Sequence, residues 1–409
     1  MPNPIAGKNI LLGITGSIAA YKAADLASKL TQAGAAVDAI LTPAALKFVT
    51  PLTFQSVTGR KAFTEDDLWG GEGHVRHIGL GTAGDLLVIA PASANTLAKL
   101  AHGFADNLLT ITALAARCPL MLAPAMDGGM FSHPATQVNL EVLRQRGGII
   151  VGPAEGRMAS GLVGLGRMVE PAELLGHIRL ALGRGGALSG ARVLVTAGGT
   201  QEPLDPVRAI TNRSSGKQGY ALAQAALDAG AEVTLVHTPT NLSTPVGVQD
   251  VLVHTAAEME EAVLMAAGQH EVLLMAAAVA DFRPAQAASQ KIKKGSGRLR
   301  LALEPTDDIL LKLAGLRQPG LLPRVVVGFA AESQDLEKNA ATKLAAKKLD
   351  LIVANDISAP DAGFGVETNR VTLLYADGRR EELPLQSKAE VGEEVVGSVV
   401  MLLRDQPIC

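Results

Sequence analysis

Small polar residues at the end of the first apolar run could hold a phosphate-bearing ligand. The run KNILLGITG (8–16) ends in Gly16, and Ser17 follows directly. Glycine lets the backbone approach a ligand closely, and a helix N-terminus offers free N–H groups to a phosphate. The spacing in GITGSIAA (13–20) does not match the dinucleotide fingerprint. A plain tight turn between strand and helix is therefore the alternative.

Two histidines, His74 and His77, lie close together farther along the same half. A side chain whose pKa lies near neutrality suits proton removal at physiological pH. The neighbouring residues do not choose between the two. A surface histidine in a polar loop is the alternative for either.

The second half carries candidate groups in a polar, glycine-rich stretch and in separate lysines. AGGTQEPLDPVRAITNRSSGKQG (197–219) contains SGK, but the first glycine of a phosphate loop is missing and Gln218 replaces Ser or Thr. We reject that motif and predict a general anion site at a helix N-terminus. Lys291 lies in KIKK, and Lys343 and Lys347 fall four apart on one predicted helix face. Solvated surface is the ordinary alternative for such lysines.

These candidate groups stand at the ends of predicted strands. The strands of the first half are KNILLGITG, AVDAILT, DLLVIAPAS, CPLMLAPAM and GIIVGP, and those of the second are ARVLVTAGG, EVTLVHT, EVLLMAAAVADF, RVVVGFAAES and DLIVANDIS. Helical periodicities separate them, which predicts an α/β fold with two Rossmann-like parallel sheets. RVTLLYADGRREELPL predicts an antiparallel hairpin around Asp377-Gly378. Ligands in such sheets bind beyond the carboxyl ends of the strands.

Length and composition indicate two domains and exclude several classes of function. The 409 residues exceed one typical core, and glycine-rich GRGGALSG (183–190) predicts a linker at 183–189 between domains 1–182 and 190–409. The net charge of -3 gives no general attraction to nucleic acid, and no apolar run reaches the ~20 residues of a membrane span. Two cysteines without metal-like spacing favour a reducing cytoplasm.

The first half resembles the flavin-containing cysteine decarboxylases over about residues 5–182. GITGSIAAYK (13–22), RHIGL with His77, PASANT (91–96) and PAMDGGM (124–130) occur in the family's order, and PASANT matches letter for letter. The resemblance implies a Rossmann-like fold that forms trimers with FMN between subunits. It also implies that His77 is the catalytic base. The implied FMN-binding residues are Gly16, Ser17, Thr42, Ser93 and Asn95.

Two positions depart from that family's pattern. Asp127 replaces an asparagine that binds the substrate carboxylate, and an ionised aspartate would repel that group. Asp127 must therefore be protonated or contact something else. Ser160, in MASGLVGLGRM (158–168), replaces a cysteine that donates a proton to the enethiol product. Ser160 relays a water proton or is a flap residue without a chemical role, and the residues favour neither.

The second half resembles phosphopantothenate–cysteine ligase over about residues 190–402. The matching segments are EPLDPVRAITNRSSGKQG, AAVADFRP, KIKK and VGFAAE. The resemblance implies that the carboxylate of 4'-phosphopantothenate attacks a nucleotide, CTP or ATP, with Mg2+, and that L-cysteine then displaces the nucleotide. Lys291 and Asn212 are the implied catalytic residues. The implied nucleotide-binding residues are Asp281, Lys291, Phe329, Lys343 and Lys347.

Decarboxylase first and ligase second is the order of the bacterial fusion proteins of coenzyme A synthesis. The resemblance implies trimeric decarboxylase and dimeric ligase contacts, together a dodecamer. The strongest alternative is an active ligase fused to a flavin-binding regulatory module that no longer decarboxylates, which Asp127 and Ser160 favour. A generic Rossmann oxidoreductase lacks support, because neither half has GxGxxG followed by an acidic residue ~20 positions on.

Overall fold

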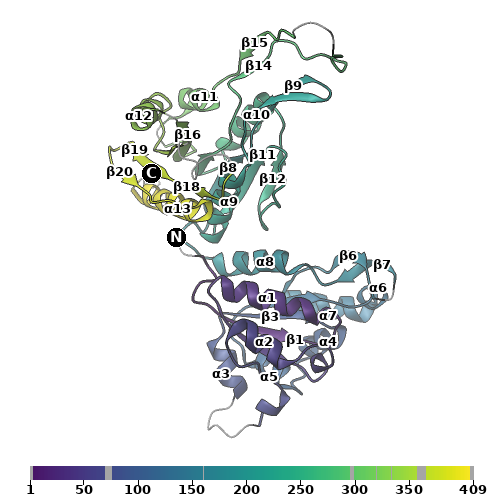
Figure 1. Cartoon of the computed structure of the whole chain (residues 1–409). Coiled ribbons are helices and arrows are strands. Elements are labelled where there is room, and N and C mark those ends of the chain that lie inside the picture. The colour runs from purple at the N-terminus through teal and green to yellow at the C-terminus, as the bar shows by residue number, and fades with distance from the viewer. Residues whose placement is uncertain are drawn as a thin grey trace. The chain divides into compact units, whose positions relative to one another are not determined.

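The computed structural model describes residues 3–69, 76–159, 161–294, 299–318, 320–332, 334–356 and 365–405. Contacts divide the chain into two compact units, Asn3–Leu182 and Gly183 onward. Each unit is an α/β layer structure (Figure 1). Alternation of strand and helix was expected in both halves and is confirmed.

A five-stranded parallel sheet forms the centre of the N-terminal unit, in the order β2-β1-β3-β4-β5. Its strands are Asn9–Ile14 (β1), Ala36–Leu41 (β2), Leu86–Ala92 (β3), Leu120–Pro124 (β4) and Ile149–Ile150 (β5). The first four strands are almost wholly buried, as parallel strands covered on both faces must be. Their carboxyl ends therefore meet at one edge of the sheet.

Helices cover both faces of this sheet. Ala20–Gln32 (α1), Pro51–Thr58 (α2) and Pro171–Gly183 (α8) pack on one face, around Leu26, Phe54 and Ile178. The other face carries Arg76–Ala83 (α3), Ala94–His102 (α4), Leu108–Ala115 (α5) and Pro134–Gln145 (α7). An antiparallel ribbon, Ala154–Arg157 (β6) and Val163–Arg167 (β7), extends beyond the sheet near the short helix Gly128–Ser132 (α6).

The C-terminal unit contains an eight-stranded sheet in the order β12-β11-β8-β13-β16-β17-β19-β20. The strands are Arg192–Ala197 (β8), Glu232–His237 (β11), Gln249–Leu252 (β12), Val272–Met275 (β13), Val325–Glu332 (β16), Leu351–Asp356 (β17), Val371–Tyr375 (β19) and Arg380–Glu382 (β20). β17, β19 and β20 pair antiparallel, and β19 and β20 flank Asp377 and Gly378. The hairpin expected from the sequence is confirmed.

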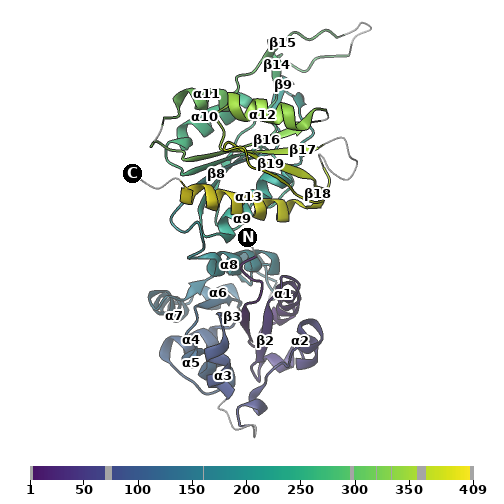
Figure 2. The same cartoon turned by 90° about the vertical axis from the view of Figure 1, so that its left-hand side faces the viewer.

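Helices cover both faces of the larger sheet (Figure 2). Lys217–Asp228 (α9) and Lys388–Asp405 (α13) pack on one face, and Ala256–Ala267 (α10), Ile309–Leu316 (α11) and Leu336–Ala346 (α12) on the other. Among the described residues, four further pairs of strands lie outside the two large sheets, and β6–β7 is one of them. Those of this unit are Gln201–Asp205 (β9) with Arg208–Thr211 (β10), Phe282–Pro284 (β14) with Leu303–Pro305 (β15), and Thr368–Asn369 (β18) with Gln386–Ser387 (β21).

The glycine-rich segment expected to be a linker packs on the C-terminal unit. Leu188 N donates to Ala229 O, and a Cβ added to Gly186 would lie 2.4 Å from that same oxygen. Glycine at this position thus permits close packing as well as a turn. In the part of the chain described, no helix has the length and apolar character needed to cross a membrane.

Candidate active sites

The N-terminal unit has a pocket of about 650 Å³ beside the carboxyl ends of β1, β3 and β4. Its lining includes Gly16, Ser17, Ser93 and Asp127. The β6–β7 ribbon contributes further side chains, among them Arg157. Four of the residues singled out in the sequence are therefore brought together from separate strand ends.

Gly16 and Ser17 form a tight turn in front of α1. A Cβ added to Gly16 would lie 2.6 Å from the Cβ of Ala44, so this position accepts no larger residue without a shift. The Ser17 hydroxyl accepts a hydrogen bond from Ala19 N at 3.2 Å. The turn and the first turn of a 13-residue helix provide the cradle that a phosphate needs.

Thr15 ties this turn to the PASANT segment and was not singled out in the sequence. Its hydroxyl donates to Pro91 O at 2.7 Å and accepts from Ser93 N at 3.0 Å, and the residue is 1% exposed. Ser93 in turn caps α4 by accepting from Thr96 N. One buried threonine thereby fixes the two polar turns relative to each other.

Other residues expected near the flavin do not line this pocket. Thr42 is buried and its hydroxyl donates to Ile14 O at 3.3 Å, whereas Asn95 is exposed in the first turn of α4. His77 lies on α3, and its Nδ1 atom is buried without a hydrogen-bond partner among the described residues. His74 and Ser160 lie outside the described residues.

Asp127 has a structural contact that the sequence did not reveal. Its Oδ1 accepts a hydrogen bond from Gly129 N at 3.0 Å, and the residue caps the N-terminus of α6. The helix end favours a negative charge there. An asparagine could make the same contact without the charge, since its Oδ1 is also an acceptor.

A buried lysine also lines the N-terminal pocket. Lys22 is 6% exposed, and its ammonium donates to Glu170 Oε1 at 2.7 Å and to Met168 O at 3.0 Å. Arg167 Nη2 reaches the same carboxylate at 3.3 Å. The pair of cations tethers the β7 end of the ribbon to the wall of the pocket. No sequence pattern indicated a role for Lys22, apart from its place in GITGSIAAYK.

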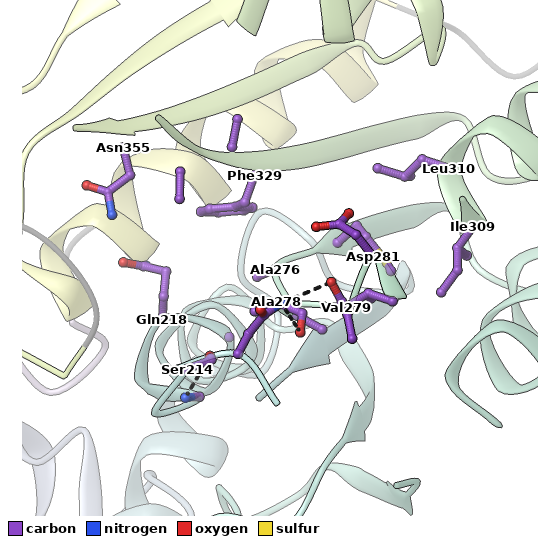
Figure 3. A pocket seen from close by; sticks show the side chains of 18 of the residues that line it. Ser214, Gln218, Ala276, Ala278, Val279, Asp281, Ile309, Leu310, Phe329 and Asn355 are labelled. Carbon is purple, nitrogen blue, oxygen red and sulfur yellow. Dashed lines mark hydrogen bonds between the residues drawn. The ribbon is translucent and has the colours of Figure 1, made fainter. Parts of the chain in front are cut away.

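The C-terminal unit has a larger pocket, about 760 Å³, at the carboxyl ends of its parallel strands (Figure 3). Strand β8 pairs with β11 on one side and with β13 on the other, so the strand order reverses direction at β8. The pocket opens at this topological switch point. The N-terminus of α9 forms one wall, and Gly216, with φ of 77°, is its N-cap. Gly219 lies so close to β8 that a Cβ would meet Ala197 Cβ at 2.5 Å.

Asn212 and Asp281 both line the pocket. The Asn212 amide donates to Ala278 O at 3.3 Å and to Val279 O at 3.1 Å, which fixes the β10–α9 connection against the segment after β13. Thr306 N donates to Asp281 O at 3.0 Å, which fixes the backbone at Asp281. Figure 3 shows the Asp281 carboxylate on the side of the pocket where Phe329 lies.

One of the expected nucleotide-binding residues contacts the N-cap residue of α11. Lys347, the C-cap of α12, pairs with Asp308 at 2.8 Å, and Asp308 caps α11 by accepting from Leu311 N. Phe329 is half-buried on β16. Lys347 and Phe329 line the pocket, whereas Lys343 is exposed and does not.

Lys291 also lies outside the pocket lining, on an exposed segment. Asp205 anchors that segment, because its carboxylate accepts from Ile292 N at 3.1 Å as well as from Val207 N and Arg208 N. Burial would raise the pKa of Asp205, but these backbone donors and Arg208 hold it below its usual value. The hairpin β9–β10 thus positions the lysine-bearing segment.

The end of the pocket away from α11 was not identified in the sequence. It contains Gln218, Asn355, Asn369 and Lys388, from four different elements. Nothing in the spacing of these residues connects them before the chain folds. Across the described ranges no group of three or more His, Cys, Asp or Glu side chains gathers as a metal site.

Comparisons with known proteins agree over nearly the whole length. Residues 2–182 match the flavoprotein family, and residues 188–402 match the DNA/pantothenate metabolism flavoprotein C-terminal domain. The coenzyme A biosynthesis bifunctional protein CoaBC of Bacillus subtilis is 44% identical over 398 residues, covering 97% of both chains. That of Vibrio cholerae is 45% identical over 406 residues, covering 98% of this chain and 99% of its own. A crystal structure of a CoaBC C-terminal domain is 40% identical, with a TM-score of 0.47, covering 54% of this chain and 100% of its own.

Proposed function

The chain belongs to the family of bifunctional coenzyme A biosynthesis proteins, and we propose that residues 1–182 carry its decarboxylase and residues 190–409 its ligase. The enzyme joins 4'-phosphopantothenate to L-cysteine and decarboxylates the product to 4'-phosphopantetheine. This assignment is supported by two separate pockets. Residues from the decarboxylase-like motifs line one pocket, and residues from the ligase-like motifs line the other. Two cysteines in 409 residues favour a cytoplasmic setting.

The N-terminal pocket fits FMN. The Gly16–Ser17 turn has no room for a side chain at Gly16 and leads into α1, as a single phosphate group requires. Ser93 and the apolar side chains of Met126, Met130 and Met158 offer a wall for the flavin ring. When bound, FMN supplies the hydride acceptor that oxidises the substrate thiol. His77 removes the thiol proton, a role that an imidazole side chain can fill.

His77 does not line the pocket of its own chain. We assign it to the pocket of a neighbouring copy, because the family places FMN between subunits of a trimer. The buried, unpartnered Nδ1 atom favours a functional role over a surface histidine. Trimeric decarboxylase contacts and dimeric ligase contacts together would give a dodecamer.

The C-terminal pocket supports formation of an acyl-nucleotide. Phe329, Lys347 and Asp281 bind the nucleotide, and Asn212 lies beside the acyl group and serves the second step. Lys291 and Lys343 approach the phosphates from outside the lining. Charge builds on phosphate oxygens during the first step, so lysines and Mg2+ carried by the phosphates stabilise it. We expect CTP to serve better than ATP, as in bacterial members of the family.

Substitution of one residue in each unit tests this assignment. His77→Asn should abolish CO2 release from supplied phosphopantothenoylcysteine and leave pyrophosphate release intact. Lys291→Gln should slow pyrophosphate release roughly 10²-fold or more and leave decarboxylation of supplied substrate intact. Loss of both activities in either folded variant would refute the division of labour.

A further inference from the structure

A polar subsite occupies the end of the C-terminal pocket that lies away from α11. Its residues are Gln218 on α9, Asn355 on β17, Asn369 on β18 and Lys388 at the start of α13. Figure 3 shows Gln218 and Asn355 at this end, with Ile309 and Leu310 at the other. Asn355 pairs with Val371 in the β17–β19 ladder, which brings the two asparagines into one neighbourhood. Among the residues that we assign to the nucleotide, Asp281 lies toward the Ile309 side of the pocket (Figure 3).

The orientation of the Asn369 amide is set by a chain of hydrogen bonds. Gln218 Nε2 donates to Lys388 O at 3.1 Å, and a carbonyl can only accept. Gln218 Oε1 therefore faces Asn369 and accepts from its Nδ2 at 2.9 Å. Asn369 Oδ1 is therefore the atom of this amide that takes no part in the chain of hydrogen bonds. It is buried and has no partner within the described part of the chain, and Asn369 is only 4% exposed.

Asn355 repeats this feature at the end of its strand. Its Oδ1 atom is likewise buried and without a hydrogen-bond partner among the described residues. A buried acceptor that lacks a donor costs about 1–3 kcal/mol. Two such oxygens at one end of one pocket indicate a ligand that brings N–H or O–H donors.

The same subsite also carries positive charge. Lys388 is 7% exposed, and Lys217 lines the pocket close enough to repel it. Burial, followed by this repulsion, lowers the pKa of the Lys388 ammonium. Glu367 pairs with Lys217 but is largely exposed. The two lysines together favour an anionic group at this end of the pocket.

A ligand for this subsite must combine an anionic group with hydrogen-bond donors. A phosphate offers only acceptors and would face the two amide oxygens unfavourably. An α-amino acid offers a carboxylate for the lysines and an α-amino group for the asparagines. Resting on the proposed ligase function, we propose that Lys388, Asn369 and Asn355 form the binding site for the α-carboxylate and α-amino group of cysteine.

The substrate itself provides the sharpest test of the Lys388 contact. Cysteamine has the amine and thiol of cysteine but no carboxylate. Parent protein should prefer cysteine, and Lys388→Met should raise the KM for cysteine roughly ten- to a hundredfold. The preference for cysteine over cysteamine, as a ratio of kcat/KM, should fall by the same factor. Pyrophosphate release with phosphopantothenate and CTP, measured without cysteine, should match the parent.

The Asn369 contact has a matched control on the same ladder. Gln386 opposes Asn369 between β18 and β21, has an unpartnered buried Nε2 atom, and does not line the pocket. Asn369→Leu should raise the KM for both cysteine and cysteamine, because both carry the amine. Gln386→Leu removes a neighbouring amide and should leave both KM values near those of the parent.

The outcomes separate the subsite from the ligase assignment. An unchanged cysteine-to-cysteamine preference in Lys388→Met, with normal pyrophosphate release, would overturn the subsite and leave the ligase. Slower pyrophosphate release in that variant with the preference unchanged would assign the lysine to phosphate and also overturn the subsite. No pyrophosphate release from the parent would remove both proposals. Equal effects of Asn369→Leu and Gln386→Leu would reduce Asn369 to a structural role.

Discussion

Asp127 is the residue at which one charge should matter most in the N-terminal pocket. Its Oδ1 atom already caps α6 through Gly129 N, so asparagine can keep the structure and remove the charge. Asp127→Asn should lower the KM for phosphopantothenoylcysteine about fivefold or more, since a like charge near the substrate carboxylate costs at least ~1 kcal/mol. Steady-state CO2 release as a function of substrate concentration measures this.

A companion variant separates the charge of Asp127 from its capping contact. Asp127→Ala removes both, so it should share any gain in substrate affinity but lose about 1 kcal/mol of stability with the cap. An unchanged or higher KM in Asp127→Asn would mean that the carboxylate does not face the substrate.

Ionisation of Asp205 should contribute to stability with a predictable dependence on pH. Its folded-state pKa is lowered, so the ionised form stabilises the fold above the ordinary aspartate pKa of ~3.9. That contribution is lost as the pH falls through the lowered folded value. Asp205→Asn should therefore melt below the parent at pH 7, and the difference should shrink as the pH approaches 3. A difference independent of pH in thermal unfolding would contradict the argument.

At the scale of elements, the hairpin β9–β10 positions the segment that bears Lys291. Asp205 in this hairpin accepts a hydrogen bond from Ile292 N. Asp205→Ala should increase hydrogen–deuterium exchange across 285–294 and slow acyl-nucleotide formation. Asp377, which accepts from Arg379 N in the β19–β20 turn, provides a matched hairpin aspartate remote from Lys291 in sequence. Asp377→Ala should change neither measurement, and similar effects of both variants would mean that loss of stability alone is responsible.

Long buried strands could be predicted from the sequence, whereas the short ribbons could not. β1, β3, β8 and β16 are apolar runs whose burial follows from their composition. β9 and β14 have no apolar alternation and contain proline, so their partners became visible only in the folded chain. The strand expected over EVLLMAAAVADF was too long. Strand β13 ends at Met275, and the residues that follow line the pocket.

The candidate sites also divide into residues that the sequence could bring together and residues that only the folded chain does. Gly16, Ser17 and Ser93 end strands next to one another in the sheet, so their proximity follows from topology. Lys388, at the start of α13, is 170 residues from Gln218 in the sequence. The Lys388 carbonyl accepts a hydrogen bond from the Gln218 side chain only because α13 packs on α9. No local pattern carries such information, which is why the cysteine subsite depends on the structure.

At the scale of the whole molecule, the placement of His77 predicts active sites shared between copies. Gly16→Val should block the pocket of its own chain, because a Cβ there already meets Ala44. His77→Asn and Gly16→Val should each be inactive in decarboxylation. Co-expressed in equal amounts, they should recover activity at about a quarter of the sites, since half of the pockets are intact and half of the neighbours supply histidine. No recovery in mixed oligomers confirmed by mass would place His77 at the pocket of its own chain.

Conversion of 4'-phosphopantothenate to 4'-phosphopantetheine by the purified protein requires both proposed activities in one chain. Purified protein with FMN should be incubated with 4'-phosphopantothenate, cysteine, Mg2+ and either CTP or ATP, and the products separated by mass. We expect 4'-phosphopantetheine, formed faster with CTP, with one CO2 and one pyrophosphate released per molecule. Accumulation of 4'-phosphopantothenoylcysteine alone would show a ligase fused to a flavin-binding module without decarboxylase activity. Absence of both products would contradict the account as a whole.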